Sequence, residues 1–327
     1  MNAPKIIVEI CQNHNGNRQI LQDMIYAAKE NGADIVKGQI IFSEDLTHRE
    51  RFDEGQEEHN GVRKTIKRPY EAEFERMKGL DLSEDDYEFF VEESNHVGIT
   101  PMLTVFSRKR LPLAAALPYK GEKMAKVASY DCGSQAMISE LADNFDNLII
   151  STGATFNEEV EKTSALLKSK NKNFALLHCV TSYPNTLTMA NLARIEWLRQ
   201  FAPAVGWSDH TLVARDGLKV AKAALMLGAD YIERHFTVLA ADKTKDGPVS
   251  INPDQLKELS SFAKLSQADQ KEIMEREIPE WKIMLGQADR EMTHTEMLNR
   301  DYYRGRFASL VGGEWIYNWE DKKVFEA

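Results

Sequence analysis

Polar side chains that could bind a metal or an anion recur where short apolar segments of the chain end. Two of these segments end in Ser208-Asp209-His210 and in Glu233-Arg234-His235. A histidine pair with carboxylates nearby suits a first-row divalent metal that keeps open positions for water or substrate. A single buried histidine at a strand end is more often a hydrogen-bonded core residue. These residues alone therefore leave a metal site and a packing role equally open.

Lysines and hydroxyl groups stand at the ends of the other apolar segments. Ammonium groups supply positive charge, and hydroxyls and backbone N–H groups fix orientation, so together they can hold phosphate and carboxylate. Either lysine alone could instead be a salt-bridged core residue, and His178, inside an apolar run, could either pack or line a site. The candidate anion-binding residues are Lys37, Thr104, Lys126, Ser129, Ser151 and Ser208.

The segments that carry these residues alternate with amphipathic helices. They are short and almost continuously apolar, as parallel strands buried on both faces are. Eight strand–helix repeats predict a closed (β/α)₈ TIM barrel of the α/β class, and no GxGxxG follows the first strand to favour a dinucleotide-binding sheet. The strands are expected at 6–11, 34–41, 99–106, 124–129, 148–152, 174–180, 205–208 and 231–236.

Helices are expected between the strands, and a barrel places its chemistry where each strand gives way to the following loop. Ser83 followed by Asp86 predicts a capped helix start, and Asn31-Gly32 predicts a helix end. The spacing of apolar residues predicts helices at 17–31, 83–97, 132–144, 157–168, 189–201, 213–227 and 253–265.

Two parts of the chain depart from the barrel repeat. The catalytic barrel is expected over residues 1–267, with a long charged insertion at about 43–82 that is either an active-site lid, a partner surface or a surface excursion. The remaining 268–327 form a short tail: a charged helix at 268–281, then an aromatic stretch with Trp315, Tyr317 and Trp319 that could form a small hairpin.

The composition limits the partners. A formal net charge of −10 disfavours nucleic acid and anionic membranes, although a local cationic cluster can still bind a small anion. No apolar run reaches the roughly 18 residues that a membrane helix needs, and no signal peptide is expected. Cys11, Cys132 and Cys179 lack CxxC spacing and read as buried apolar residues, so a cytoplasmic protein without a disulfide framework is expected.

Several motifs together resemble the sialic acid synthase family. Glu9-Ile-Cys-Gln-Asn-His14-Asn-Gly16 resembles its opening motif. The later motifs follow in the family's order and are carried by Val36–Gln39, Ser151–Gly153, Leu176–Cys179 with Tyr183-Pro184, Gly206–Thr211 and Glu233–Thr237. The resemblance extends over residues 6–265, and the last two motifs are its most specific part.

The resemblance implies a (β/α)₈-barrel enzyme that condenses phosphoenolpyruvate with the aldehyde of a hexosamine-type sugar. The products are a nonulosonic acid and phosphate, and the enzyme is a homodimer. A divalent metal, Mn²⁺ or else Mg²⁺ or Co²⁺, would be bound by His210 and His235. Phosphoenolpyruvate would be held by Lys37, Thr104, Lys126, Ser129, Ser151 and Ser208.

The resemblance also assigns the remaining site residues. Glu9 would handle the proton of the attacking water, with Asp131 as a second candidate for this role. The sugar would contact Gln39, Thr181, Tyr183 and Asp246.

Departures from the family pattern concern the sugar. Asp131 stands where a Glu is usual, Thr181 where an Asn is usual, and Asp246 lies in an altered segment that could displace it. Members usually carry a C-terminal antifreeze-like domain, which covers the partner's barrel and supplies an arginine to the N-acyl group of the sugar. Here only a remnant follows, in which Arg304 or Arg306 could substitute.

Two alternatives remain. One is a synthase for another aldose or a phosphorylated sugar, which would need basic residues of the insertion to bind the extra phosphate. The other is a catalytically silent paralogue that acts as a binding protein, against which the retained Glu9, Lys37, Lys126, His210 and His235 argue. The basic residues of the insertion are Arg49, Arg51, Arg63, Lys64, Lys67 and Arg68.

Overall fold

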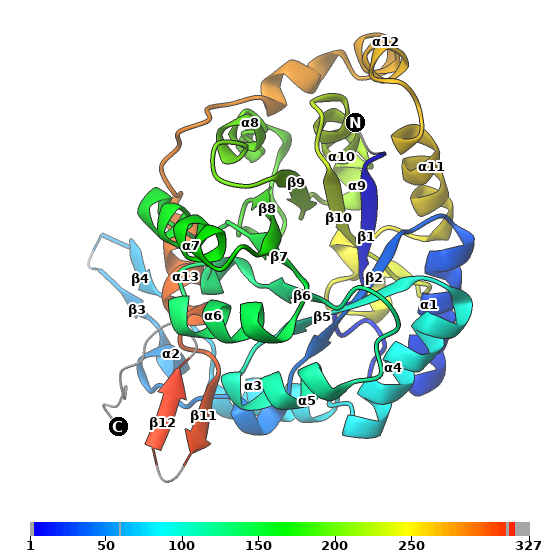
Figure 1. Cartoon of the computed structure of the whole chain (residues 1–327). Helices are drawn as coiled ribbons and strands as arrows, with labels where there is room; N and C mark the ends of the chain where they lie inside the picture. Colours follow the sequence, from blue (N-terminus) through cyan, green and yellow to red (C-terminus); the bar gives the residue numbers. More distant parts are fainter. Residues whose placement is uncertain (1–2, 59, 312–313, 318–327) are drawn as a thin grey trace.

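Eight parallel strands close into a barrel in the computed structural model, which describes residues 3–58, 60–311 and 314–317 (Figure 1). The strands follow one another around the barrel in chain order, and the last pairs with the first. The expected TIM barrel is confirmed, with every strand within two residues of its predicted bounds. The strands are β1 (Lys5–Glu9), β2 (Ile35–Ile40), β5 (Thr100–Val105), β6 (Met124–Val127), β7 (Asn147–Ser151), β8 (Asn173–Cys179), β9 (Ala204–Asp209) and β10 (Tyr231–His235).

Helices surround the barrel largely as expected. Ser83 caps α4 with the predicted capping box, and Asn17 caps α1. The helices over the barrel are α1 (Arg18–Glu30), α4 (Glu84–Val97), α5 (Leu111–Ala116), α6 (Gln135–Asn144), α7 (Asn157–Ser169), α8 (Arg194–Leu198), α9 (Val213–Asp216), α10 (Lys219–Met226) and α11 (Pro253–Ala263).

Three helices differ from the prediction. The short α5 was not predicted. The helix expected at 189–201 is reduced to α8, preceded by the 3₁₀ turn η4 (Leu187–Met189). The helix expected at 213–227 is split into α9 and α10, because Gly217 adopts a φ of 56° that a right-handed helix does not allow. None of the helices in the described ranges is both long and apolar enough to cross a bilayer.

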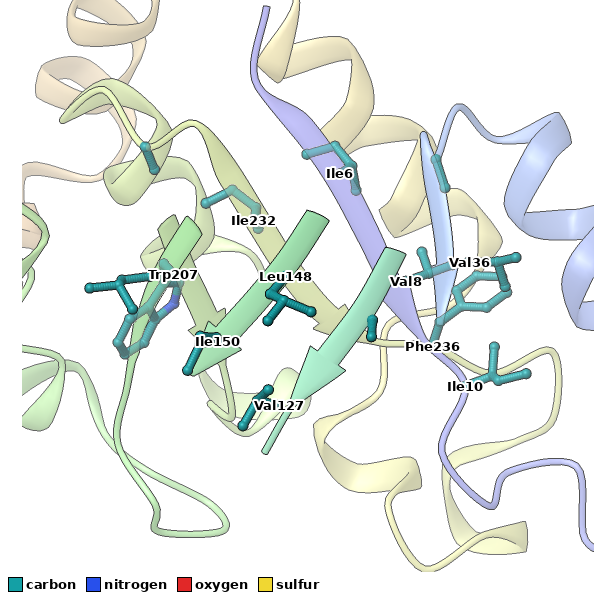
Figure 2. Close-up of a cluster of buried hydrophobic side chains, with 14 of the residues drawn as sticks. Ile6, Val8, Ile10, Val36, Val127, Leu148, Ile150, Trp207, Ile232 and Phe236 are labelled. Atoms are coloured by element: carbon teal, nitrogen blue, oxygen red, sulfur yellow. The ribbon is translucent and has the colours of Figure 1, made fainter. Parts of the chain in front are cut away.

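Alternate residues of each strand build two apolar layers, since successive side chains point to opposite faces. Figure 2 shows part of the outer layer, in which Val8, Ile150 and Ile232 belong to the cluster between strands and helices. The inner layer fills the barrel. It consists of Ile7, Ile35, Met102, Met124, Ile149, Ala175, Leu177 and Tyr231.

The inner layer determines where the polar strand-end residues point. A residue two positions further along a strand lies on the same face, so Glu9 follows Ile7 and Lys37 follows Ile35 into the barrel mouth. The same step leads from Met102 to Thr104, from Met124 to Lys126, from Ile149 to Ser151 and from Tyr231 to Glu233 and His235. The apolar inner layer, the plug of the barrel, therefore lies beneath a chamber whose floor is this ring of polar strand-end residues.

The insertion and the tail fold together above this chamber. A backbone hydrogen bond of 3.0 Å joins Thr47 N–H to the Arg306 carbonyl, and His294 Nε2 lies 2.7 Å from the Arg63 carbonyl oxygen. Figure 1 shows α13 beside the hairpin of the insertion. The insertion contains η1 (Ser43–Asp45), α2 (Arg51–Glu54), the hairpin strands β3 (Gln56–Glu57) and β4 (Arg63–Thr65), and α3 (Tyr70–Lys78).

The tail begins with the predicted charged helix, which ends at Glu277 rather than at Trp281 because Pro279 follows. The predicted hairpin is present, although Trp319 lies outside the described residues. The elements of the tail are α12 (Gln267–Glu277), η7 (Pro279–Met284), α13 (His294–Tyr303), β11 (Ala308–Val311) and β12 (Glu314–Tyr317).

Candidate active site

A cavity of about 1060 Å³ opens at the carboxyl ends of the barrel strands. Its floor is the polar strand-end ring, and its walls include the insertion hairpin and α13. With the exception of Asp131, every residue that the sequence assigned to a site lines it. These residues are Glu9, Lys37, Gln39, Thr104, Lys126, Ser129, Ser151, Thr181, Tyr183, Ser208, His210, His235 and Asp246.

Lys37 and Glu9 form a buried ion pair on neighbouring strands. The register places Glu9 beside Lys37, so their side chains meet inside the barrel. Glu9 Oε1 also accepts a hydrogen bond of 2.6 Å from the backbone N–H of Cys11, and Lys37 Nζ donates to Thr104 Oγ1 at 3.0 Å. Ion pair and N–H donor together favour an ionised Glu9.

Lys126 forms a second buried pair, with Glu233 Oε2 at 3.7 Å, and donates to Ser151 Oγ at 2.7 Å. Glu233 accepts a hydrogen bond of 2.8 Å from Ser208 Oγ. Burial raises the pKa of Glu233, but Lys126 and Lys37 outweigh burial and lower it below its usual value. Glu233 was not predicted as a site residue, although its place two positions before His235 indicated it.

The chamber floor is close to neutral, because two carboxylates balance the two lysines. A substrate with several negative charges would therefore need further positive charge nearby. The hydroxyls around the lysines can orient such an anion but cannot neutralise it.

His210 and His235 lie at the ends of adjacent strands with ring centroids 5.4 Å apart. His210 Nδ1 lies 3.1 Å from the Val180 carbonyl oxygen, which fixes the proton on Nδ1 and leaves Nε2 as a free acceptor. Burial lowers the pKa of His210 to about 4 and that of His235 well below its usual value. Both rings are therefore neutral at pH 7, as metal ligands must be.

The donor set fits a divalent metal with open positions. His235 makes no hydrogen bond to any residue that the structure describes. Within the described ranges no group of three or more His, Cys, Asp or Glu side chains could hold an ion, so water and substrate would complete the coordination of a metal on these two rings.

A buried ion pair fixes the two strands that carry the histidines. Arg234 Nη1 lies 2.7 Å from Asp209 Oδ1, and both side chains are fully buried. Arg234 also donates to Thr211 Oγ1 at 2.9 Å. Because Asp209 and Arg234 directly precede His210 and His235, this pair on the outward face positions the rings on the inward face.

The residues assigned to the sugar lie above the histidines. The Tyr183 ring lies tilted against His210 with ring centroids 4.2 Å apart, and Thr181 Oγ1 lies 3.2 Å from Ser129 Oγ. Asp246 lines the cavity despite its altered sequence context, and burial raises its pKa.

Three other candidates lie elsewhere. Asp131 is buried at the end of η3 (Ser129–Asp131) and does not line the cavity. His178 has a packing role, because its Nε2 lies 2.8 Å from the Ala190 carbonyl oxygen and its ring contacts Trp207. Arg304 pairs with Glu159 at 3.3 Å and does not line the cavity.

Residues of the tail complete the chamber, and of these the sequence indicated only Arg306. Asn299 Nδ2 of α13 donates to the Thr181 carbonyl at 2.8 Å, and Tyr303 stacks on Tyr130 at 5.1 Å. These contacts join segments more than a hundred residues apart in the sequence. The tail lies outside the strand–helix repeat, so that repeat does not predict them. The cavity-lining residues from α13 and beyond are Thr295, Leu298, Asn299, Tyr303 and Arg306.

Comparison with known proteins is consistent with this site. The NeuB family model matches residues 24–273. The chain is 33% identical over 263 residues to N,N'-diacetyllegionaminic acid synthase of Legionella pneumophila, covering 78% of this chain and 69% of the relative. It is 27% identical over 268 residues to pseudaminic acid synthase of Helicobacter pylori, covering 81% of this chain and 75% of that relative.

Solved structures agree. A sialic acid synthetase from Leptospira borgpetersenii in complex with citrate superimposes with a TM-score of 0.68 at 25% identity, covering 92% of this chain and 91% of that chain. The spore coat polysaccharide biosynthesis protein SpsE of Bacillus subtilis gives a TM-score of 0.70 at 24% identity, covering 93% and 79%. The match of the family model, supported by the Legionella relative, shows that this chain belongs to the NeuB family.

Proposed function

We propose that this protein condenses phosphoenolpyruvate with the aldehyde of a hexosamine-type sugar and releases a nonulosonic acid and phosphate. The observation that supports this most strongly is the convergence of two lysines, four hydroxyl side chains and a neutral histidine pair on one cavity. The relatives named above are synthases of such acids. A catalytically silent barrel would not need buried charges at this density.

The bond changes follow from the substrates. C3 of phosphoenolpyruvate forms a carbon–carbon bond to the aldehyde carbon, and the aldehyde oxygen takes up a proton. Water adds to C2, losing one proton, and the C2–O bond to phosphate breaks. The sum is one phosphoenolpyruvate, one aldose and one water for one sugar acid and one phosphate.

The strand-end residues have distinct roles in this proposal. Lys37 and Lys126 hold the phosphate and carboxylate of phosphoenolpyruvate, and the neighbouring hydroxyls orient them. Glu9 accepts the proton of the attacking water, since Lys37 and the Cys11 N–H keep it ionised. Thr181, Tyr183, Gln39 and Asp246 face the sugar.

We expect His210 and His235 to hold the divalent metal, Mn²⁺ or a similar ion. Such an ion supplies a Lewis acid for the aldehyde oxygen and the positive charge that the neutral chamber floor lacks. The neutral rings and the free Nε2 of His210 support this expectation.

Phosphate release from phosphoenolpyruvate in the presence of Mn²⁺, measured across a panel of hexosamines, tests the function. We expect sugar-dependent phosphate release and a product whose mass equals the sum of aldose and pyruvate. Release only with aldoses of another type would favour the synthase for a different sugar. Absence of release with every sugar, although metal is bound, would favour the silent paralogue.

Replacing Glu9 tests the assignment of the base. Glu9→Gln keeps the shape but cannot accept a proton, so kcat should fall about 100-fold or more while phosphoenolpyruvate still binds. Asp131→Asn is the matched control, because Asp131 does not line the cavity. Undiminished turnover in Glu9→Gln would remove Glu9 from this role, and a loss confined to Asp131→Asn would transfer it.

A further inference from the structure

Six cationic side chains outside the strand-end ring line the cavity. Two of them, Arg63 and Lys67, pair with Glu57 and Glu54, and the other four come from separate segments. Arg68 follows β4, Arg76 belongs to α3, Lys245 follows β10 and Arg306 follows α13. They come from the insertion, the last barrel loop and the tail, so none belongs to the strand-end ring. We call them the outer cation cluster.

One buried carboxylate holds two members of this cluster from behind. Glu73 of α3 accepts hydrogen bonds from Arg76 Nε at 3.0 Å and Nη2 at 2.9 Å, and also from Arg306 Nη2. Glu73 is only 8% exposed and does not line the cavity. Its bonds therefore fix the two guanidiniums. Arg76 Nη1 also donates to Gln12 Oε1 at 3.2 Å, whereas Nη1 of Arg306 makes no hydrogen bond to a residue that the structure describes.

The other two members have no such partner. Neither Lys245 nor Arg68 forms an ion pair with any residue in the part of the chain that the structure describes. Lys245 is solvent-exposed where it lines the cavity. Desolvation by the surrounding groups is the first cause that lowers its pKa to about 8; Glu73 opposes this fall, and the three guanidiniums reinforce it. Arg76 and Arg306 share Glu73, and all four cationic side chains line the same cavity.

The charges of the cluster do not cancel. Four cations face Glu73 behind them and Asp246 beside them, and the positive charges of Lys245, Arg76 and Arg306 act on Asp246. The sum is two positive charges at the cavity wall. Surface cations are normally solvated or paired, so an excess that converges on an enclosed space indicates an anionic ligand.

The outer cation cluster is separate from the chamber floor. Burial lowers the pKa of Lys37 to about 7; Glu233 opposes this fall and Lys126 reinforces it. The floor lysines have their own carboxylates, Glu9 and Glu233. The cavity thus has one anion-binding centre at the strand ends and another at its outer wall.

We propose that the outer cation cluster binds a phosphate monoester carried by the aldose at the end remote from its aldehyde. This inference rests on the proposed function, in which the floor binds phosphoenolpyruvate and the sugar lies above it. A phosphate monoester carries a charge close to −2 at pH 7, which matches the excess, and its oxygens suit guanidinium donors. A carboxylate would leave one positive charge unbalanced.

Matched pairs of substrates test the proposal on the full-length protein with Mn²⁺ and phosphoenolpyruvate. Each hexosamine is compared with its own 6-phosphate, and a uronic acid tests the carboxylate. We expect kcat/KM to be at least about tenfold higher for the phosphorylated sugar, the effect of one charge-assisted hydrogen bond. Equal or higher kcat/KM for the unphosphorylated sugar, or a preference for the uronic acid, would overturn the proposal.

Lys245→Gln is the diagnostic variant, because it removes one charge and leaves the hydrogen bonds of Glu73 to Arg76 and Arg306 in place. It should raise KM for the phosphorylated aldose about tenfold and leave KM for phosphoenolpyruvate unchanged. Lys243→Gln, two residues away on the exposed loop and outside the cavity, is the matched control and should change neither. A rise in KM for phosphoenolpyruvate alone would show that the cluster serves that substrate instead.

Direct binding separates this inference from the proposed function. If no sugar supports turnover, calorimetric titration of wild type and Lys245→Gln with the hexosamine 6-phosphate still decides the matter. Binding of the 6-phosphate that weakens in the variant would support the cluster as a phosphate site. Equal binding in both proteins, or none in the wild type, would refute it whatever the enzyme catalyses.

Discussion

At the scale of single residues, the two carboxylates of the chamber floor have different roles because their neighbours differ. Glu9 has one lysine and one backbone N–H, which leaves lone pairs free for a proton. Glu233 is held by Ser208 and lies between Lys126 and Lys37, so it serves to keep the lysines in place. Neighbouring positive charge favours the ionised form of both. Each lies two positions after a residue of the apolar plug on its strand, so both point into the chamber.

The histidine pair gives the first prediction at this scale. His210→Ala and His235→Ala should each weaken Mn²⁺ binding about 100-fold or more, because only these two side chains are expected to hold the ion. Electron paramagnetic resonance of free Mn²⁺ measures the affinity. His48→Ala on the exposed insertion is the control and should bind as wild type does. Unchanged affinity in both active-site variants would contradict the assignment.

Lys245 gives a prediction about pH. Its pKa of about 8 means that raising the pH through 8 removes one positive charge from the outer cation cluster. The kcat/KM for a phosphorylated aldose should therefore be full below pH 8 and fall above it, since this parameter reports the free enzyme. The charged groups around Lys245 are Glu73, Arg76, Arg68, Arg306 and Asp246.

A pH profile of Lys245→Gln checks the origin of this fall. In the variant, kcat/KM for the phosphorylated aldose should be lower than in wild type at pH values below 8. It should not decline near pH 8, because glutamine does not titrate. A decline that persists unchanged in the variant would assign it to another group.

Single residues were predictable where a strand fixed their direction. Lys37, Lys126 and Ser151 lie on the inner face of the barrel because each stands two positions after an inward-facing apolar residue of its strand. Asp131 was not constrained in this way, since it belongs to a 3₁₀ turn beyond its strand and turns away from the cavity. Lys245 and Arg76 were not predicted for the same reason: a loop and the insertion, rather than a barrel strand, determine their positions.

At the scale of elements, α13 acts as the cover of the chamber, and three contacts fasten it. Arg300 donates to the Ala154 carbonyl at 2.6 Å and to both carboxylate oxygens of Glu159. Asn299 bonds to Thr181, and His294 contacts the insertion hairpin. Residues of the insertion also line the cavity, so the insertion is part of the site and more than a surface excursion.

Loosening α13 should affect the sugar and spare phosphoenolpyruvate. Arg300→Ala removes the bonds to α7 and to the Ala154 loop, at a cost of about 1–3 kcal/mol. Amide hydrogen exchange in α13 should accelerate, and KM for the aldose should rise several-fold. Lys271→Ala, on an exposed pair of α12, is the control. Unchanged exchange in α13 would show that the helix is held by other contacts.

Elements were predictable where local pattern and tertiary packing agree. The strands and the capped helices α1 and α4 follow from periodicity and from their cap residues. The break at Gly217 could not be predicted, because a glycine in a helical pattern is often tolerated. Only its positive φ in the structure shows that the helix is interrupted there. The cover α13 was not predicted, and its position depends on long-range contacts.

At the scale of the whole molecule, the tail folds back over its own barrel, and α13 and Arg306 line the cavity. The family resemblance predicts a partner's cap above the barrel, whereas here α13 and Arg306 of the same chain occupy the cavity wall. We still expect a homodimer, which light scattering would test. Because the chain supplies these walls itself, specific activity should stay constant as a dimer is diluted. Activity that falls with dissociation would show that the partner completes the site.

The central claim is that phosphoenolpyruvate reacts by carbon–oxygen cleavage after attack of water at C2. Turnover in H₂¹⁸O with an accepted aldose tests it most directly, with the released phosphate examined by mass spectrometry. The account predicts sugar-dependent release of phosphate that contains no ¹⁸O, because the bridging oxygen leaves with phosphorus. Phosphate that carries ¹⁸O, or release that does not depend on a sugar, would contradict it.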